Sequence, residues 1–129
     1  MFWRSGSTSE RNCGTDDAPL QCWLCRDDEV LASLEVPVTR RSKARGLLGR
    51  DGIEGAILLR PARSIHTVGM RFNLDVALLD ADDVVIKTLR VRRHRVTAPI
   101  WRARAVLEAE AGAFNTWELK IGDKLEIRE

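Results

Sequence analysis

The sequence predicts a single α+β domain that is mostly β, with antiparallel strands and one or two short helices. Two observations predict this class. Short apolar runs recur along the chain and are bounded by Asp, Gly or Pro, which is the pattern of strands joined by turns. Helical patterning is confined to residues 40–48 and 113–120. The length of 129 residues suits one domain, expected over residues 21–129, with a core of its own.

The first two strands are expected to form a hairpin. Residues 21–26 and 29–36 are apolar runs, and the second alternates between apolar and polar positions. The Asp27-Asp28 pair between them has the composition of a turn. Pro37 ends the second strand, because proline cannot donate a backbone hydrogen bond to a sheet.

A short helix is expected next, over residues 40–48. Thr39 is suited to cap its start, because a threonine side chain accepts a hydrogen bond from an N–H of the first turn. Gly49 is suited to end it as a left-handed cap. Gly46 would then lie inside the helix, where glycine costs about 1 kcal/mol relative to alanine. Close backbone packing would explain this glycine.

The remaining strands follow the same logic of apolar runs between turns. Residues 75–80 form an apolar run bounded by acids, typical of a strand that is buried on both faces. An Asp-rich turn follows, and the chain returns from Val84 to complete a hairpin that ends at Arg92. Further strands are expected at 56–59, 105–111 and 124–128.

The stretch from Ser64 to Asp80 concentrates the residues that could form a site. Its first part has neither the period of a strand nor that of a helix, so we expect a bent strand or a loop across the end of the sheet. Asp75 opens the buried strand and needs a partner, because an unpaired buried carboxylate is costly. Arg71 and His66 are the nearest candidates.

Composition and charge bound the function. Residues 1–20 are rich in Ser, Gly, Thr and Asp and are expected to form a disordered tail. The net charge of +2 does not by itself imply a nucleic acid or membrane partner. No run approaches the roughly 18 apolar residues of a membrane span, and the start lacks the apolar core of a signal peptide. A cytoplasmic protein without a membrane partner is expected.

The three cysteines predict neither a disulfide framework nor a metal site. Cys22 and Cys25 are spaced as in a C-x-x-C motif, but they lie on an expected strand, where residues three apart point to opposite faces. A zinc site that adds Cys13 and a histidine is the lesser alternative. No cofactor is expected.

The segment from Lys87 to Arg104 carries seven basic residues and no acidic one, and it includes Trp101. Basic side chains interleaved with an aromatic ring suit single-stranded nucleic acid, so RNA binding through residues 87–104 is one hypothesis. A solvated edge strand is the preferred interpretation, because basic side chains discourage pairing between sheet edges. Nucleic acid is therefore not the expected partner.

Several motifs together are similar to the family catalogued as domain of unknown function 192, over about residues 31–127. They are the RGLLGR segment at 45–50, SIHTVGMRF at 64–72 leading into the strand at 75–80, Val106-Leu107-Glu108, and the Gly122-Asp123 turn. The resemblance implies a compact, mostly β, barrel-like domain with one or two short helices. It implies no reaction.

We expect a binding module rather than an enzyme, for an anionic small molecule or an acidic partner surface. A hydrolase-like enzyme that uses His66 as an acid–base group, oriented by the Asp75 carboxylate, is the remaining alternative, although no nucleophile elbow or phosphate loop is present. Glu108 is expected to form a salt bridge with one of the arginines. The family signature and the turns place six candidate ligand-binding residues together: Arg45, Arg50, His66, Met70, Arg71 and Asp75.

Overall fold

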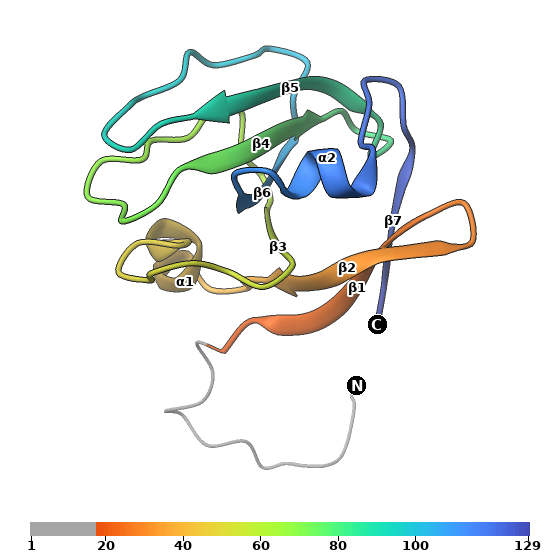
Figure 1. Ribbon diagram of the computed structural model, residues 1–129, viewed down its shortest axis with the longest axis horizontal. Coiled ribbons are helices and arrows are strands. Elements are labelled where there is room, and N and C mark those ends of the chain that lie inside the picture. Colours follow the sequence, from red (N-terminus) through yellow and green to blue (C-terminus); the bar gives the residue numbers. More distant parts are fainter. Residues whose placement is uncertain (1–17) are drawn as a thin grey trace.

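The frame of the protein is one curved sheet of seven strands with two short helices (Figure 1). The computed structural model describes residues 18–129. The expected mostly-β α+β class is confirmed; the tail expected at 1–20 lies outside the described residues apart from 18–20. In chain order the elements are β1 (Leu20–Arg26), β2 (Glu29–Val36), α1 (Arg40–Arg45), β3 (Ala56–Leu59), β4 (Leu74–Leu79), β5 (Val85–Val91), β6 (Ala105–Glu110), α2 (Ala113–Trp117) and β7 (Leu125–Arg128).

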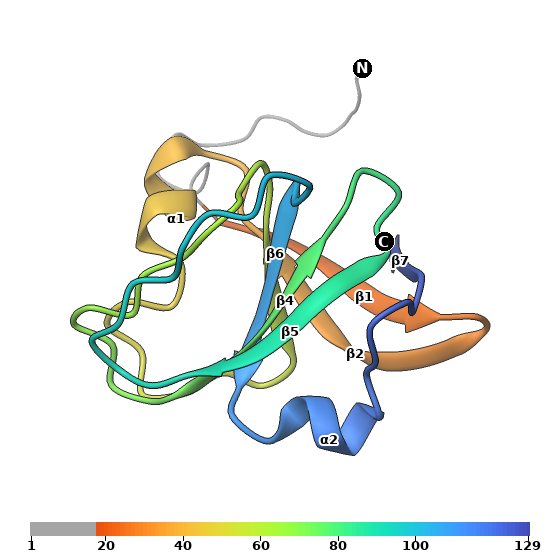
Figure 2. The ribbon, with the colours of Figure 1, turned by 90° about the horizontal axis from the view of Figure 1, so that it is seen from above.

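The sheet curls so that its two edges come into contact at one point. Its strand order is β5-β4-β6-β3-β2-β1-β7, and the edges touch at a bridge between Val84 and Lys124 (Figure 2). The result is a half-open barrel. The pairing is mainly antiparallel, as predicted, and one pair of strands, β2 and β3, is parallel. The reason is that residues 37–55 cross over through α1, so the chain re-enters the sheet in the same direction. Neither described helix is long and apolar enough to cross a bilayer.

Apolar side chains from every strand fill the inside of the barrel. Phe114 of α2 packs against them at one end, and β6 contributes three of them in strict alternation. This is the period of two that a strand imposes on its side chains. The buried members are Cys22, Leu24, Leu34, Ala56, Leu58, Ala77, Leu79, Val85, Ala105, Leu107, Ala109, Phe114 and Leu125.

The outer face of the central strands is apolar as well, and chain segments without regular structure cover it. All six residues of β4 are buried, which confirms the expected strand with two buried faces. Leu47, Ile65 and Met70 come from the covering segments and pack onto Val76 and other side chains of the sheet. The cover is formed by the turn after α1, the loop of residues 60–73 and the loop of residues 92–104.

Thr67 fastens the two covering loops to each other. Its hydroxyl donates to the carbonyl of Arg92 at 2.6 Å and accepts from the backbone N–H of Arg95 at 2.9 Å. Its own N–H and carbonyl bond the backbones of Arg95 and His94 at 2.7 and 2.8 Å. The side chain is fully buried, so these bonds also satisfy polar groups that water cannot reach. They hold the neighbouring His66 in place, in a bridge with Val96.

Helix α1 is shorter than predicted. Thr39 caps it as expected, since its side chain accepts from the N–H of Ser42 at 3.1 Å. The helix ends at Arg45 rather than Leu48, because Gly46 leaves the helical conformation with φ of +51°. Such a positive φ strains residues with a side chain, so Gly46 ends the helix instead of lying inside it, and Gly49 is not the cap.

Asp75 is buried and partnered, as expected, but its expected partners were wrong. Its side chain points toward the barrel interior and accepts hydrogen bonds from the backbone N–H groups of Gly112 and Phe114 at 2.9 and 3.1 Å. Arg90 donates to its other oxygen at 3.0 Å. Strand alternation is the reason: the residues that contact the covering loops are Leu74 and Val76, on the opposite face of β4. Asp75 therefore anchors the start of α2.

We predict that Asp75→Ala lowers the free energy of unfolding by about 3 kcal/mol or more, because hydrogen bonds to a buried charged group contribute about 1.5–3 kcal/mol each. The matched control is Asp51→Ala, which removes an exposed ion pair with Arg71 and should cost less than about 1 kcal/mol. Urea unfolding of both variants measures the difference. Equal losses in the two variants would contradict the role assigned to Asp75.

Candidate functional site

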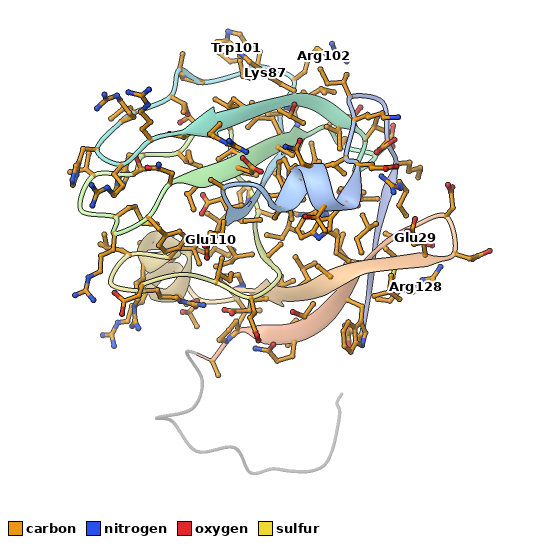
Figure 3. All side chains as sticks on the ribbon, in the orientation of Figure 1. Glu29, Lys87, Trp101, Arg102, Glu110 and Arg128 are labelled. Atoms are coloured by element: carbon orange, nitrogen blue, oxygen red, sulfur yellow. The ribbon has the colours of Figure 1, made fainter. Side chains whose placement is uncertain are left out.

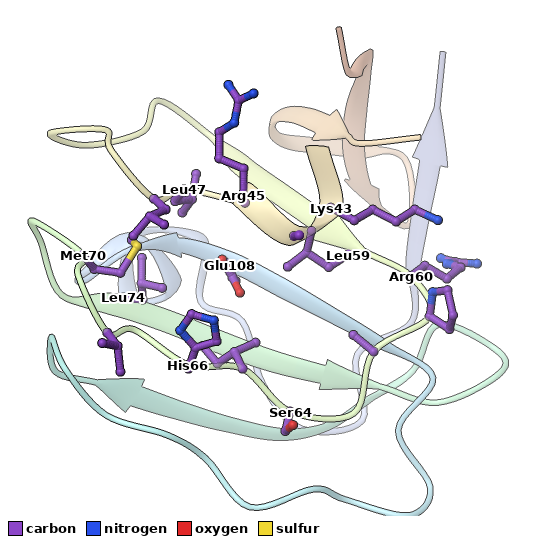
Figure 4. A pocket seen from close by; sticks show the side chains of 17 residues that line it. Lys43, Arg45, Leu47, Leu59, Arg60, Ser64, His66, Met70, Leu74 and Glu108 are labelled. Atoms are coloured by element: carbon purple, nitrogen blue, oxygen red, sulfur yellow. The ribbon is translucent and has the colours of Figure 1, made fainter. Parts of the chain in front are cut away.

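A cavity of about 230 Å³ lies between the outer face of the sheet and its cover (Figure 4). Leu59 and Leu74 contribute its walls from the sheet, and Leu47 and Met70 contribute them from the covering segments. Four basic side chains line its edge: Lys43, Arg45, Arg60 and His66. The cavity thus combines apolar walls with a positively charged mouth.

Glu108 lies in this cavity with no partner. It occupies the central strand β6, where its neighbours in register are Ile57 of β3 and Val76 of β4. Only 5% of the residue is exposed, and among residues 18–129 no hydrogen bond or ion pair reaches its carboxyl group. A buried polar side chain without a partner is rare in folded proteins and needs an explanation. The expected salt bridge with an arginine is therefore wrong.

The environment of Glu108 favours its neutral form. Burial raises the pKa of its carboxyl group from the usual 4.5 to about 7. Near neutral pH the group is then about half protonated. The protonated carboxyl offers one O–H donor to a ligand, and the ionised carboxylate offers only acceptors. Small changes in pH or in the bound molecule can therefore change what Glu108 presents to the cavity.

The cationic groups stand around this carboxyl without contacting it. In Figure 4 the imidazole of His66 faces the same space as Glu108, whereas Arg45, Lys43 and Arg60 extend outward at the edge. The charged ends of long basic side chains remain near water in this way while their stems line the cavity. An anionic molecule that enters would meet these cations first and Glu108 last.

Three of the six residues predicted for the site line the cavity, namely Arg45, His66 and Met70. The other three do not. Arg50 forms a two-pronged ion pair with Glu35 at 2.8 and 2.9 Å, Arg71 pairs with Asp51 at 3.0 Å, and Asp75 lies on the other face of β4.

Sequence reasoning missed Glu108, although a signal was present. Glu108 shares a strand face with Val106, and apolar residues stand on both sides of it in the sequence. An acid in the middle of a strand that is buried on both faces points to a special environment.

The basic segment 87–104 consists of strand β5 and the loop of residues 92–104. Arg90 is its only residue in an ion pair within the described part of the chain. Trp101 is 84% exposed, with the guanidinium of Arg63 at 5.8 Å from its ring, and Figure 3 shows it along the same edge of the molecule as Lys87 and Arg102. An exposed tryptophan among cations can stack on a base or another planar group.

The thiols show no metal chemistry within residues 18–129. Cys22 and Cys25 are free and buried, and no three His, Cys, Asp or Glu side chains of this range gather as metal ligands. Cys13, the third member of the alternative zinc site, lies outside the described residues.

Replacing Glu108 by glutamine should change the pH dependence of stability. The pKa of Glu108 is higher in the folded protein than in the unfolded chain, so its protonated form stabilises the fold. This stabilisation, about 3 kcal/mol in the free energy of unfolding, is fully present below about pH 4.5 and is lost as the pH rises to about 7. The glutamine of Glu108→Gln does not titrate, so the variant does not lose this stabilisation as the pH rises. The free energy of unfolding of the variant minus that of the wild type should therefore increase by about 3 kcal/mol over this range.

Urea unfolding at about pH 4.5, 6 and 8 measures this difference. The control is Glu110→Gln, at the exposed end of the same strand, for which the difference from the wild type should stay nearly constant. Parallel stability curves for Glu108→Gln and the wild type would contradict the raised pKa.

Two solved structures share this fold. A protein of Sinorhizobium meliloti with a provisional name as a transcription regulator superposes with a TM-score of 0.71 at 18% identity, covering 85% of this chain and 95% of its own. A protein of unknown function from Novosphingobium aromaticivorans superposes with a TM-score of 0.66 at 18% identity, covering 94% and 99%. At this identity the likeness shows the fold alone. No curated protein matches the sequence.

The family model for domain of unknown function 192, described as "Uncharacterized ACR", matches residues 23–127. This range includes every strand but the first residues of β1 and the last of β7, and it contains the whole cavity. It also agrees with the resemblance carried by the RGLLGR and SIHTVGMRF segments. The chain therefore belongs to the domain of unknown function 192 family.

Proposed function

We propose that this protein is a small binding domain whose cavity takes an anionic small molecule with an apolar part. The observation that carries the proposal is Glu108, a buried carboxyl group with no partner among residues 18–129, inside a cavity with a basic mouth. Domains keep such an unsatisfied group at a cost to stability, and a ligand that bonds to it would remove that cost.

The size and lining of the cavity indicate the kind of molecule. At about 230 Å³ it is smaller than the roughly 300–1,000 Å³ of sites for drug-sized ligands, so it suits a molecule of few heavy atoms. Leu47, Leu59 and Met70 would contact an apolar part, and the cations at the mouth favour a negative charge.

The hydrolase-like alternative loses the pair on which it depended. It required Asp75 to orient His66, but Asp75 bonds to α2 and Arg90 on the other face of β4. His66 then has no carboxylate to orient it from that position. A binding role for His66 at the cavity mouth agrees better with this arrangement.

The loop of residues 92–104 favours a second candidate, the binding of single-stranded RNA. Its support is the exposed Trp101 beside Arg63, together with basic residues of the loop that form no ion pair within residues 18–129. RNA binding ranks second because basic side chains at a sheet edge have another explanation: they prevent that edge from pairing with the edge of another sheet.

Fluorescence anisotropy with a labelled oligouridine tests whether the loop of residues 92–104 binds RNA. If the loop binds RNA, affinity falls steeply with salt, and Trp101→Ala weakens it by the roughly 1–3 kcal/mol of a lost stacking contact. If the loop is a solvated surface, which we expect, no complex forms at physiological salt and Trp101→Ala changes nothing.

The pocket proposal predicts saturable binding of short-chain anions at one place. In ¹H–¹⁵N spectra, butyrate, butanesulfonate or butyl phosphate should shift the amide signals of Leu47, His66 and Met70. Reversing the charge of Lys43 and Arg45 to Glu should weaken this binding several-fold, because the anion then enters past negative charges. The matched control reverses Arg92 and Arg93, which lie outside the cavity. Equal effects of the two double variants would contradict the proposal.

A further inference from the structure

The groups that face Glu108 determine which ligand it can hold. The neighbouring strands present apolar residues, Ile57 from β3 and Val76 from β4, and the cover presents Leu47 and Met70. None of these four side chains can form a strong hydrogen bond or an ion pair with the carboxyl group of Glu108. The other titratable or charged groups that line this space come from α1 and the loop after β3: Lys43, Arg45, Arg60 and His66. On β6 itself, Glu110 is exposed at the end of the strand and does not line the cavity.

A carboxyl group in such surroundings is about half protonated near neutral pH, and its protonated form carries an O–H that needs an acceptor. No acceptor bonds to it within the described residues. The protonated form of Glu108 is therefore a hydrogen-bond donor at the base of the cavity that no acceptor of residues 18–129 satisfies, and a bound molecule can supply the acceptor.

We propose that the ligand is a short-chain monocarboxylate and that its carboxylate accepts a hydrogen bond from the protonated side chain of Glu108. This inference rests on the proposed function of the cavity as a site for a small anion. The apolar chain of the ligand would lie against Leu59, Met70 and Leu74, and the cations at the mouth would offset its charge. One proton is then shared between two carboxyl groups, as in other close carboxyl pairs.

Other charged groups fit this base less well. A phosphate is bound through several donors, typically arginine forks or a row of backbone N–H groups, whereas the base of this cavity offers a single O–H. A primary ammonium group would suit an ionised Glu108, but it would have to pass Lys43, Arg45 and Arg60 at the mouth. A carboxylate is the anion that a single protonated carboxyl group matches.

The proposal makes binding depend on pH in one direction. Ionised Glu108 would repel the carboxylate and has no proton to donate, so the affinity should fall about tenfold per pH unit above the pKa of Glu108. A second ionisable side chain, the imidazole of His66, lines the same cavity. The experiment must therefore separate these two residues.

Hexanoate is the probe, with hexanamide and hexylamine as matched neutral and cationic analogues. Dissociation constants from ¹H–¹⁵N titrations between about pH 6 and 9 should show hexanoate affinity falling about tenfold per pH unit above about pH 7 in the wild type. Glu108→Gln keeps a donor at every pH, so it should bind hexanoate with nearly constant affinity. His66→Gln should retain the wild-type fall. Glu108→Leu, which has no donor, should bind at least tenfold more weakly than Glu108→Gln.

The outcomes distinguish this inference from the proposed function. If none of the three probes shifts the cavity signals at any pH, the small-ligand function itself is wrong. If hexanoate binds there but its affinity keeps the same fall in Glu108→Gln, or becomes constant in His66→Gln, the site exists and the pairing with Glu108 is wrong. Tighter binding of hexylamine than of hexanoate at about pH 8 would show that Glu108 acts as an anion instead.

Discussion

The central strands of this protein carry apolar side chains on both faces, and both faces must be covered. The barrel interior covers one face with side chains from the other strands. The other face is covered by the turn after α1 and two long loops, and Thr67 fastens the two loops together through its buried hydroxyl and backbone. The cavity next to Glu108 lies between this cover and the sheet.

Two buried acids on neighbouring strands show how the same residue class serves structure and function. Asp75 receives three hydrogen bonds and joins β4 to α2 and β5, so its charge is compensated within the fold. Glu108 stands on the outer face of β6 and receives none from the described chain. The barrel needs the first acid to close its end, whereas no element of the fold depends on the second. A function other than stabilising the fold therefore explains best why an acid occupies position 108.

Local patterns predicted the strands well and the site only in part. Turn residues such as Asp27, the cap at Thr39 and the period of two identified the elements, since these signals depend on near neighbours in the sequence. The partners of Asp75 come from residues 15 to 39 positions away, which no local pattern reveals. The surroundings of Glu108 are of the same kind, because they are set by the loops that cover its strand. The family signature grouped Arg45, His66 and Met70, which line one cavity, with three residues that are partnered elsewhere in the fold.

The central claim is that Glu108 is a carboxyl group held near its neutral form by burial and kept available for a ligand. Its side-chain ¹³C resonance, assigned by comparison with Glu108→Gln, reports its protonation directly as the pH is changed. The account predicts a titration midpoint of about 7 for this one glutamate. A midpoint close to 4.5, the usual value for an exposed glutamate, would contradict the account.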